Sequence, residues 1–161
     1  LIASASTKLA MTFVVGVIIL VPLNYFITRK QIYLSEKMVE VANTGYRTNT
    51  FLRDAECIKK SLTIVLIGTK VSPIGLDCGF CGFQSCKKLG ELSGACAHNS
   101  GDLGIAVGSA ASIAADHRID NRIMYTVGYA AVKLKLLGDD IKIAFGIPLS
   151  ATGKNIFFER K

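Results

Sequence analysis

Residues 62–68, Leu-Thr-Ile-Val-Leu-Ile-Gly, form an uninterrupted apolar run of strand length that ends in a glycine. A continuous run of this kind is typical of a strand that is buried on both faces of a sheet. The chain then enters a glycine-rich stretch, residues 73–100, which has no regular period and holds four of the five cysteines. We expect one domain over residues 1–161, in which residues 73–100 form an inserted loop that is organised by what its four cysteines bind.

A helix is predicted before this strand. In residues 31–42 the apolar side chains fall on one helical stripe among lysines and glutamates, and Gly45 is a suitable stop. Residues 50–52 are interpreted as a short strand between that helix and the run at 62–68.

Farther toward the N-terminus, residues 9–27 are almost entirely apolar and are followed by Arg29 and Lys30. The length and the basic flank are those of a membrane span. The β-branched residues at the centre of the run favour a buried strand instead, and a membrane anchor stays as the alternative.

Two helices and a strand are predicted after the cysteine stretch. The first helix runs from Asp102 to about residue 115, and its glycines and alanines leave one face almost bare, so another helix or a planar ligand can approach it closely. Asp120 is a suitable N-cap for a second helix that ends near Gly138, and residues 141–147 predict a strand that Pro148 ends. This order of elements predicts an α+β fold arranged as an α/β layered sandwich.

The composition limits the classes of function. The 161 residues are 50% hydrophobic and 19% charged, which suffices for one buried core. The net charge of +7 is spread along the chain without an aromatic-basic stripe, so we expect an acidic partner or anionic cofactor rather than nucleic acid. The cysteines crowd into one stretch, with Cys57 alone, which is not a disulfide framework and indicates a reducing, cytoplasmic compartment.

The four clustered cysteines are the strongest functional signal, and their spacing is Cys78-x2-Cys81-x4-Cys86-x9-Cys96. Four thiolates are what a 4Fe-4S cluster needs, one per iron, and glycines at 79 and 82 let the backbone fold tightly around it. Zinc also takes four thiolates but usually shows two Cys-x2-Cys pairs, so with one such pair it is the alternative metal. His98 is interpreted as a hydrogen-bonded histidine rather than a ligand.

Longer stretches of the sequence resemble a known family. The segments that contain Leu52-Arg-Asp-Ala, Asp120-Asn-Arg-Ile-Met-Tyr and Gly146-Ile-Pro-Leu-Ser-Ala-Thr-Gly-Lys are similar to the DUF2148 family of ferredoxin domain-containing proteins of bacteria and archaea. The resemblance extends from Leu52 to near the C-terminus. It implies an iron-sulfur cluster and carries no settled activity with it.

A second resemblance is to the nitroreductase family of flavoproteins. It rests on Asp102-Leu-Gly-Ile-Ala, the helix that follows, and Phe145-Gly-Ile-Pro148, which occur in that order. The resemblance implies a nitroreductase-like fold and FMN bound against the bare helix face, at Gly104 and Gly108, in the interface of a homodimer. We interpret residues 146–154 as a turn that caps the last strand. The alternative interpretation is an anion site, in which Lys154 together with Arg122 or Arg160 would bind a phosphate.

Three functions agree with these observations. The first is an electron-transfer protein whose 4Fe-4S cluster passes single electrons to a redox partner protein or to a bound flavin, which would make the chain a flavin-dependent oxidoreductase. The second is a non-catalytic binding or regulatory module, in which a cluster or a zinc ion cross-links the loop and senses redox state. The third is a membrane-anchored subunit of a redox complex. Full cysteine ligation leaves no open iron, which favours the first.

Overall fold

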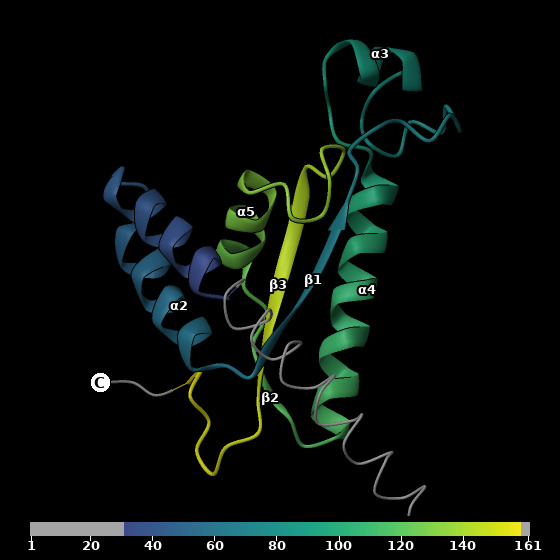
Figure 1. Ribbon diagram of the computed structural model, residues 1–161. Helices are drawn as coiled ribbons and strands as arrows, with labels where there is room; N and C mark the ends of the chain where they lie inside the picture. Colours follow the sequence, from purple (N-terminus) through teal and green to yellow (C-terminus); the bar gives the residue numbers. More distant parts are fainter. Residues whose placement is uncertain (1–30, 159–161) are drawn as a thin grey trace, which may run out of the picture.

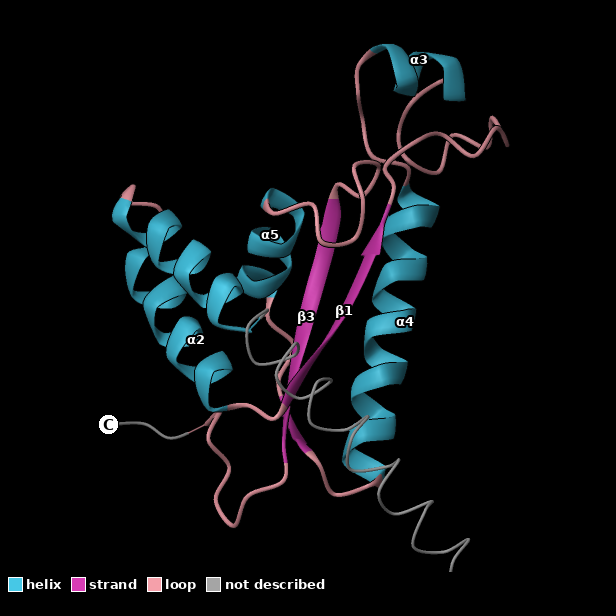
Figure 2. Cartoon of the chain, viewed as in Figure 1, coloured by secondary structure: helices cyan, strands magenta, loops and turns pink. Residues whose placement is uncertain are grey.

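A computed structural model of the chain describes residues 31–158, in which helices lie on both faces of a small sheet (Figures 1 and 2). Residues 31–43 are helical. The elements that follow are α2 (Thr48–Lys60), β1 (Thr63–Thr69), α3 (Cys86–Glu91), α4 (Ala97–Asp116), β2 (Asp120–Asn121), α5 (Tyr125–Lys133) and β3 (Ile143–Ser150). The predicted α+β class is confirmed. The layered sandwich and the nitroreductase-like arrangement remain predictions.

The sheet has three strands in the order β1-β3-β2, and both pairings are antiparallel. β1 pairs with β3 along its whole length, from Thr63 opposite Leu149 to Thr69 opposite Ile143. β2 pairs only with the last two residues of β3, and one further bridge joins Met124 to Gly146. The first half of β3 therefore has no strand beside it on the β2 side within the described part of the chain.

Side chains on β1 and β3 alternate between two hydrophobic clusters, as the period of a strand requires. On one face, Ile67 and Ile147 pack against Leu103 and Val107 of α4. On the other face, Ile64 and Leu66 pack against the cluster formed by α2, α5 and the helix over residues 31–43, in which the largest buried side chains include those of Met38, Phe51, Ile58 and Val127. The sheet is thus covered on both sides, and among the described residues α4 is the helix that covers one of the two faces (Figure 1).

Two glycines set the close approach of α5 to β3. A Cβ atom on Gly128 would lie 1.8 Å from the carbonyl oxygen of Ala144, and one on Gly146 would lie 2.2 Å from a methyl carbon of Val127. No real side chain tolerates such distances, so the helix and the strand are packed backbone to backbone at this point.

Several boundaries differ from the sequence predictions. The strand predicted at residues 50–52 is wrong, because these residues belong to α2, whose buried Phe51, Ala55 and Ile58 recur at helical spacing. Asp120 does not cap a helix but lies in β2, and α5 begins only at Tyr125. The helix predicted from Asp102 begins earlier, at Ala97. Part of residues 73–100 is therefore helical, and the same stretch also contains the short helix α3.

Pro148 does not end the last strand, which continues to Ser150. The backbone nitrogen of Gly146 donates to Met124 and so points away from β1. Two residues further on, the nitrogen of Pro148 faces the same way, and its missing N–H therefore removes no hydrogen bond between β1 and β3.

None of the helices among residues 31–158 is both long and apolar enough to cross a membrane. The apolar run at residues 9–27 lies outside the described residues.

Candidate metal centre

The cysteine loop, residues 70–96, leaves the sheet where β1 ends and returns at the start of α4, and it contains only the short helix α3 (Figure 2). Its base is tied together by two hydrogen bonds. The backbone nitrogen of Cys96 donates to the carbonyl of Val71 at 3.3 Å, and the side-chain amide of Asn99 donates to the carbonyl of Ser72 at 2.8 Å. The loop therefore projects from one end of the sheet on a closed neck.

The four predicted ligands lie on this loop with different exposure. Cys78 is exposed, Cys81 and Cys86 are half-buried, and Cys96 is buried at the neck. Cys96 is also the N-cap residue of the 20-residue helix α4. The backbone N–H groups at the start of a helix have no intrahelical partners, and the Cys96 side chain makes no capping hydrogen bond with them.

Asp77 holds Cys86 through a reciprocal pair of hydrogen bonds. The backbone nitrogen of Cys86 donates to Asp77 Oδ1 at 2.6 Å, and the backbone nitrogen of Asp77 donates to Cys86 Sγ at 3.3 Å. Asp77 adopts φ 47°, a left-handed conformation that aspartate tolerates better than most residues. Sequence analysis missed Asp77; an aspartate directly before the first cysteine was the available signal.

His98 lies beside the first cysteine. Its Nε2 atom is 3.7 Å from Cys78 Sγ, and its ring packs on that of Phe80 with 5.2 Å between centroids. Cys78 is the cysteine of the loop that is farthest from His98 in the sequence, and the fold brings the two side chains within reach of an N–H···S hydrogen bond.

Comparison with known proteins agrees with this cysteine-bearing loop. Residues 93–160 match a family model described as an uncharacterized protein containing a ferredoxin domain, DUF2148. An uncharacterized protein of Archaeoglobus fulgidus is 43% identical over 136 residues, which cover 79% of this chain and 72% of the relative. The chain belongs to the DUF2148 family. No solved structure matches it.

Membership in DUF2148 suggests an iron-sulfur cluster and, in general terms, electron transfer, because the family is described by its ferredoxin domain. The segment matched by the DUF2148 model contains Cys96 but begins after Cys78, Cys81 and Cys86. The assignment of those three thiols to a cluster therefore rests on the chemistry of the loop.

The donor set fits a cluster by its chemistry. All four cysteines are free thiols, and Gly79 and Gly82 adopt positive φ values of 69° and 81° that let the backbone turn sharply between them. Within residues 31–158, no three His, Cys, Asp or Glu side chains are placed to share one metal ion. Because metal binding and local folding are coupled, we expect the ligands to draw together when the cluster binds.

The residues predicted for a flavin or anion lie on two different parts of the DUF2148 chain. Gly104 and Gly108 are on the exposed side of α4, and a Cβ atom on either would meet nothing within 4 Å. Arg122 follows β2 and donates to the carbonyl of Phe157 at 2.8 Å, with its guanidinium carbon 5.2 Å from the ring centroid of Phe158. Lys154 lies exposed in the turn after β3, at the end of the sheet where β2 pairs.

Cys57 stands apart from the loop, on α2, as its isolation in the sequence indicated. It is nearly buried, and its thiol lies 3.9 Å from the carbonyl oxygen of Ile156. Burial raises the pKa of the Cys57 thiol above its usual value of 9.0, and the nearby charge of Asp54 raises it further. A thiol kept protonated is a poor metal ligand, and Cys57 serves the core.

Proposed function

We propose that this chain is an electron-transfer protein in which Cys78, Cys81, Cys86 and Cys96 bind one 4Fe-4S cluster. The observation that carries the proposal is the presence of four free thiols on a single glycine-rich loop, in a family described by a ferredoxin domain. A cluster held by four cysteines supplies one-electron transfer without an open coordination position.

Two groups of the protein would stabilise the reduced state of a cluster bound to these thiols. The N–H of Asp77 that donates to Cys86 Sγ lowers the electron density on that sulfur, and the backbone N–H groups at the start of α4 would face a negatively charged cluster held by Cys96. Both effects favour the more negative, reduced state of a thiolate-bound centre. Free thiols also require a reducing compartment, such as the cytoplasm.

A redox partner protein is part of the proposal, because the cysteine loop presents a surface suited to transient contact. Four apolar side chains on or beside it are exposed: Ile74 at 45%, Leu76 at 61%, Phe80 at 70% and Leu92 at 63%. Exposed apolar groups gathered on one loop are typical of interaction sites. Lys87 and Lys88 are exposed among them and favour an acidic partner.

Anaerobic reconstitution with ferrous iron and sulfide tests the cluster. We expect about four irons and four sulfides per chain, a visible thiolate-to-iron absorption, and an electron paramagnetic resonance signal on reduction. Cys81→Ser should lose most of the bound iron, whereas the matched control Cys57→Ser should keep it. Zinc in a colourless anaerobic preparation, or equal iron in both variants, would refute the proposal.

FMN on the glycine-bearing face of α4 stays a prediction of the nitroreductase resemblance. Titration of the reconstituted protein with FMN measures it directly: quenching of flavin fluorescence with one site per chain would support it. Loss of that binding in Gly104→Leu, together with weaker binding in Arg122→Gln, would assign the site. Absence of quenching would leave a protein with a single redox centre.

A further inference from the structure

A cleft lies between the side chains of α5 and the first half of β3, at the edge of β3 where no described strand is paired. β2 pairs with β3 only at Leu149 and Ser150, and beyond the bridge at Gly146 no strand among residues 31–158 pairs with residues 143–145 on that side. The cleft there has a volume of about 310 Å³, and Tyr129 and Val132 of α5 and Phe145 of β3 line it. This volume is at the lower end of the range for small-molecule sites, and it suits a compound of two or three rings.

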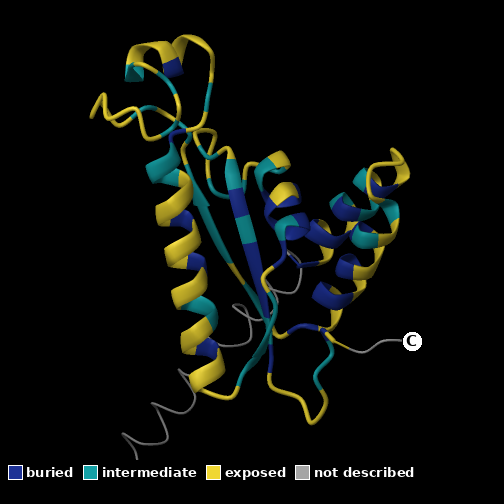
Figure 3. Ribbon diagram, turned by 180° about the vertical axis from the view of Figure 1, so that it is seen from behind, coloured by how far each residue is buried: buried dark blue, intermediate teal, exposed yellow. Residues whose placement is uncertain are grey.

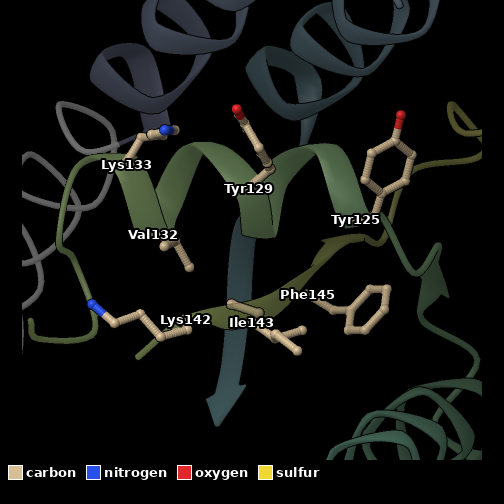
Figure 4. A pocket seen from close by; sticks show the side chains of 8 residues that line it. Tyr125, Tyr129, Val132, Lys133, Lys142, Ile143 and Phe145 are labelled. Carbon is tan, nitrogen blue, oxygen red and sulfur yellow. The ribbon is translucent and has the colours of Figure 1, made fainter. Parts of the chain in front are cut away.

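The cleft is chemically divided along its length (Figure 4). Tyr125 and Phe145 lie at one end, and Lys133 and Lys142 lie at the other, with Val132 pointing between them toward β3. The lining contains no carboxylate. One end therefore offers aromatic surface and the other positive charge.

The two lysines keep their charge available. No ion pair among residues 31–158 joins either of them to a carboxylate, because the nearby Asp139 is paired with Lys135 and Asp140 with Lys70. Lys142 Nζ donates to the backbone carbonyl of Asp139 at 3.1 Å, and Lys133 Nζ lies 5.5 Å from the centre of the Tyr129 ring. Neither contact involves a carboxylate, although the charge of Lys142 also acts on Asp140, whose pKa is lowered by Lys70 first and by Lys142 in addition.

The walls of the cleft are fixed in position. Gly128 presses against the carbonyl of Ala144, so α5 and β3 are locked together one turn before Val132. A site that is formed before its ligand arrives binds without the cost of ordering its walls.

We propose that this cleft binds a small planar aromatic anion, a fused-ring carboxylate, sulfonate or phosphate. Its ring lies against the side chain of Val132 and the edge of β3 at residues 143–145, and its negative group lies at Lys142, with Lys133 adding to the positive potential. Lys142 also borders a second hollow of about 510 Å³, formed with Gly90, Ser93 and Gly94 of the cysteine loop, so the bound anion faces that loop. The binding does not depend on the metal, and it can be measured on the metal-free chain.

Titration of the full chain with anilinonaphthalene sulfonate, read by fluorescence and calorimetry, tests the site. We expect one saturable site per chain that naphthoate displaces and neutral naphthamide displaces much less well. Lys142→Gln should weaken binding about five- to tenfold, as the loss of a charge-assisted contact does. The control Lys60→Gln removes an exposed lysine of α2 that does not line the cleft, and it should leave the affinity unchanged.

Val132→Phe fills the cleft from its apolar wall and should abolish binding, while Ile105→Phe on α4 should not. Circular dichroism and thermal unfolding of each variant separate a blocked cleft from a misfolded chain. The proposal is overturned if the dye binds Lys142→Gln and Val132→Phe as it binds the unchanged protein, or if naphthamide competes as well as naphthoate. It is also overturned if sedimentation shows a dimer that Val132→Phe dissociates, because a second copy then occupies this edge.

Discussion

Asp54 is a buried carboxylate that links α2 to α5. Thr126 Oγ1 donates to its Oδ2 atom at 2.6 Å, and the guanidinium of Arg53 contacts its Oδ1 atom at 2.7 Å and 2.8 Å. Both carboxylate oxygens are therefore satisfied although the residue is only 2% exposed. A buried charge of this kind contributes stability only while its partners remain.

Thr126→Val keeps the shape of the side chain but leaves one oxygen of Asp54 without a donor. We expect the free energy of unfolding to fall by about 1–3 kcal/mol, the cost of a buried acceptor that has lost its partner. Urea denaturation measures it. Thr44→Val removes an exposed hydroxyl and should change stability by less than about 0.5 kcal/mol, and equal effects of the two variants would contradict this role for Asp54.

Cys57 predicts a pH dependence whose sign follows from its raised pKa. The thiol is neutral when protonated, and burial followed by the charge of Asp54 disfavours the thiolate in the folded state. Its contribution to stability is therefore complete below the unfolded pKa and is lost as pH rises from about 9.0 through the higher folded value. The difference in unfolding free energy between the unchanged chain and Cys57→Ala should shrink above that pH. A constant difference would contradict the raised pKa.

At the scale of elements, the contact between α5 and β3 depends on one missing side chain. In Gly128→Ala the new Cβ would lie 1.8 Å from Ala144 O, against backbone that cannot move aside alone. We expect a loss of about 3 kcal/mol or more, since the helix must shift from the strand. Gly101→Ala in α4 is the matched control, because its Cβ meets nothing within 4 Å and alanine favours a helix by about 1 kcal/mol. Thermal unfolding should separate the two by opposite signs, and a shift in the same direction would contradict the packing.

The elements differ in how far the sequence predicts them, for physical reasons. The run at residues 62–68 is apolar throughout and matches β1, Thr63–Thr69, within one residue. α2 escaped prediction because Arg53, Glu56, Lys59 and Lys60 fill its exposed side, and the buried Asp54 interrupts the apolar spacing of its inner side. β2 has only two residues, so its pairing with β3 is a tertiary contact that no local pattern encodes.

The four thiol ligands of the candidate site could be predicted from the sequence, but the residues that hold these ligands in position could not. Cysteine spacing identifies the four thiols, since ligand chemistry restricts which residues serve. The hydrogen bonds of Asp77 to Cys86 and the contact of His98 with Cys78 depend on how the loop folds back on itself. The need for glycine at position 128 is likewise visible only once α5 lies on β3.

For the whole molecule, the two faces of the sheet are covered unequally. Among residues 31–158, α4 is the helix that covers its face; it buries Leu103, Val107 and Ala114, and its other side is exposed along the helix (Figure 3). That outer side carries Ile105 at 73% and Ile113 at 57% exposure, together with Gly104 and Gly108. Large exposed side chains beside glycines allow a second helix to pack closely, and we propose this side of α4 as the interface of the homodimer that the nitroreductase resemblance predicts.

Ile105→Glu tests that dimer. A carboxylate in the centre of an apolar interface would be buried without a partner, so we expect the mutant to sediment as a monomer at concentrations where the unchanged chain is dimeric. Leu52→Glu on α2 is the control, because it adds the same charge to an exposed apolar position on the opposite side of the sheet, and it should leave the association unchanged. A monomeric unchanged chain, or a dimer that survives Ile105→Glu, would show that α4 is not the interface.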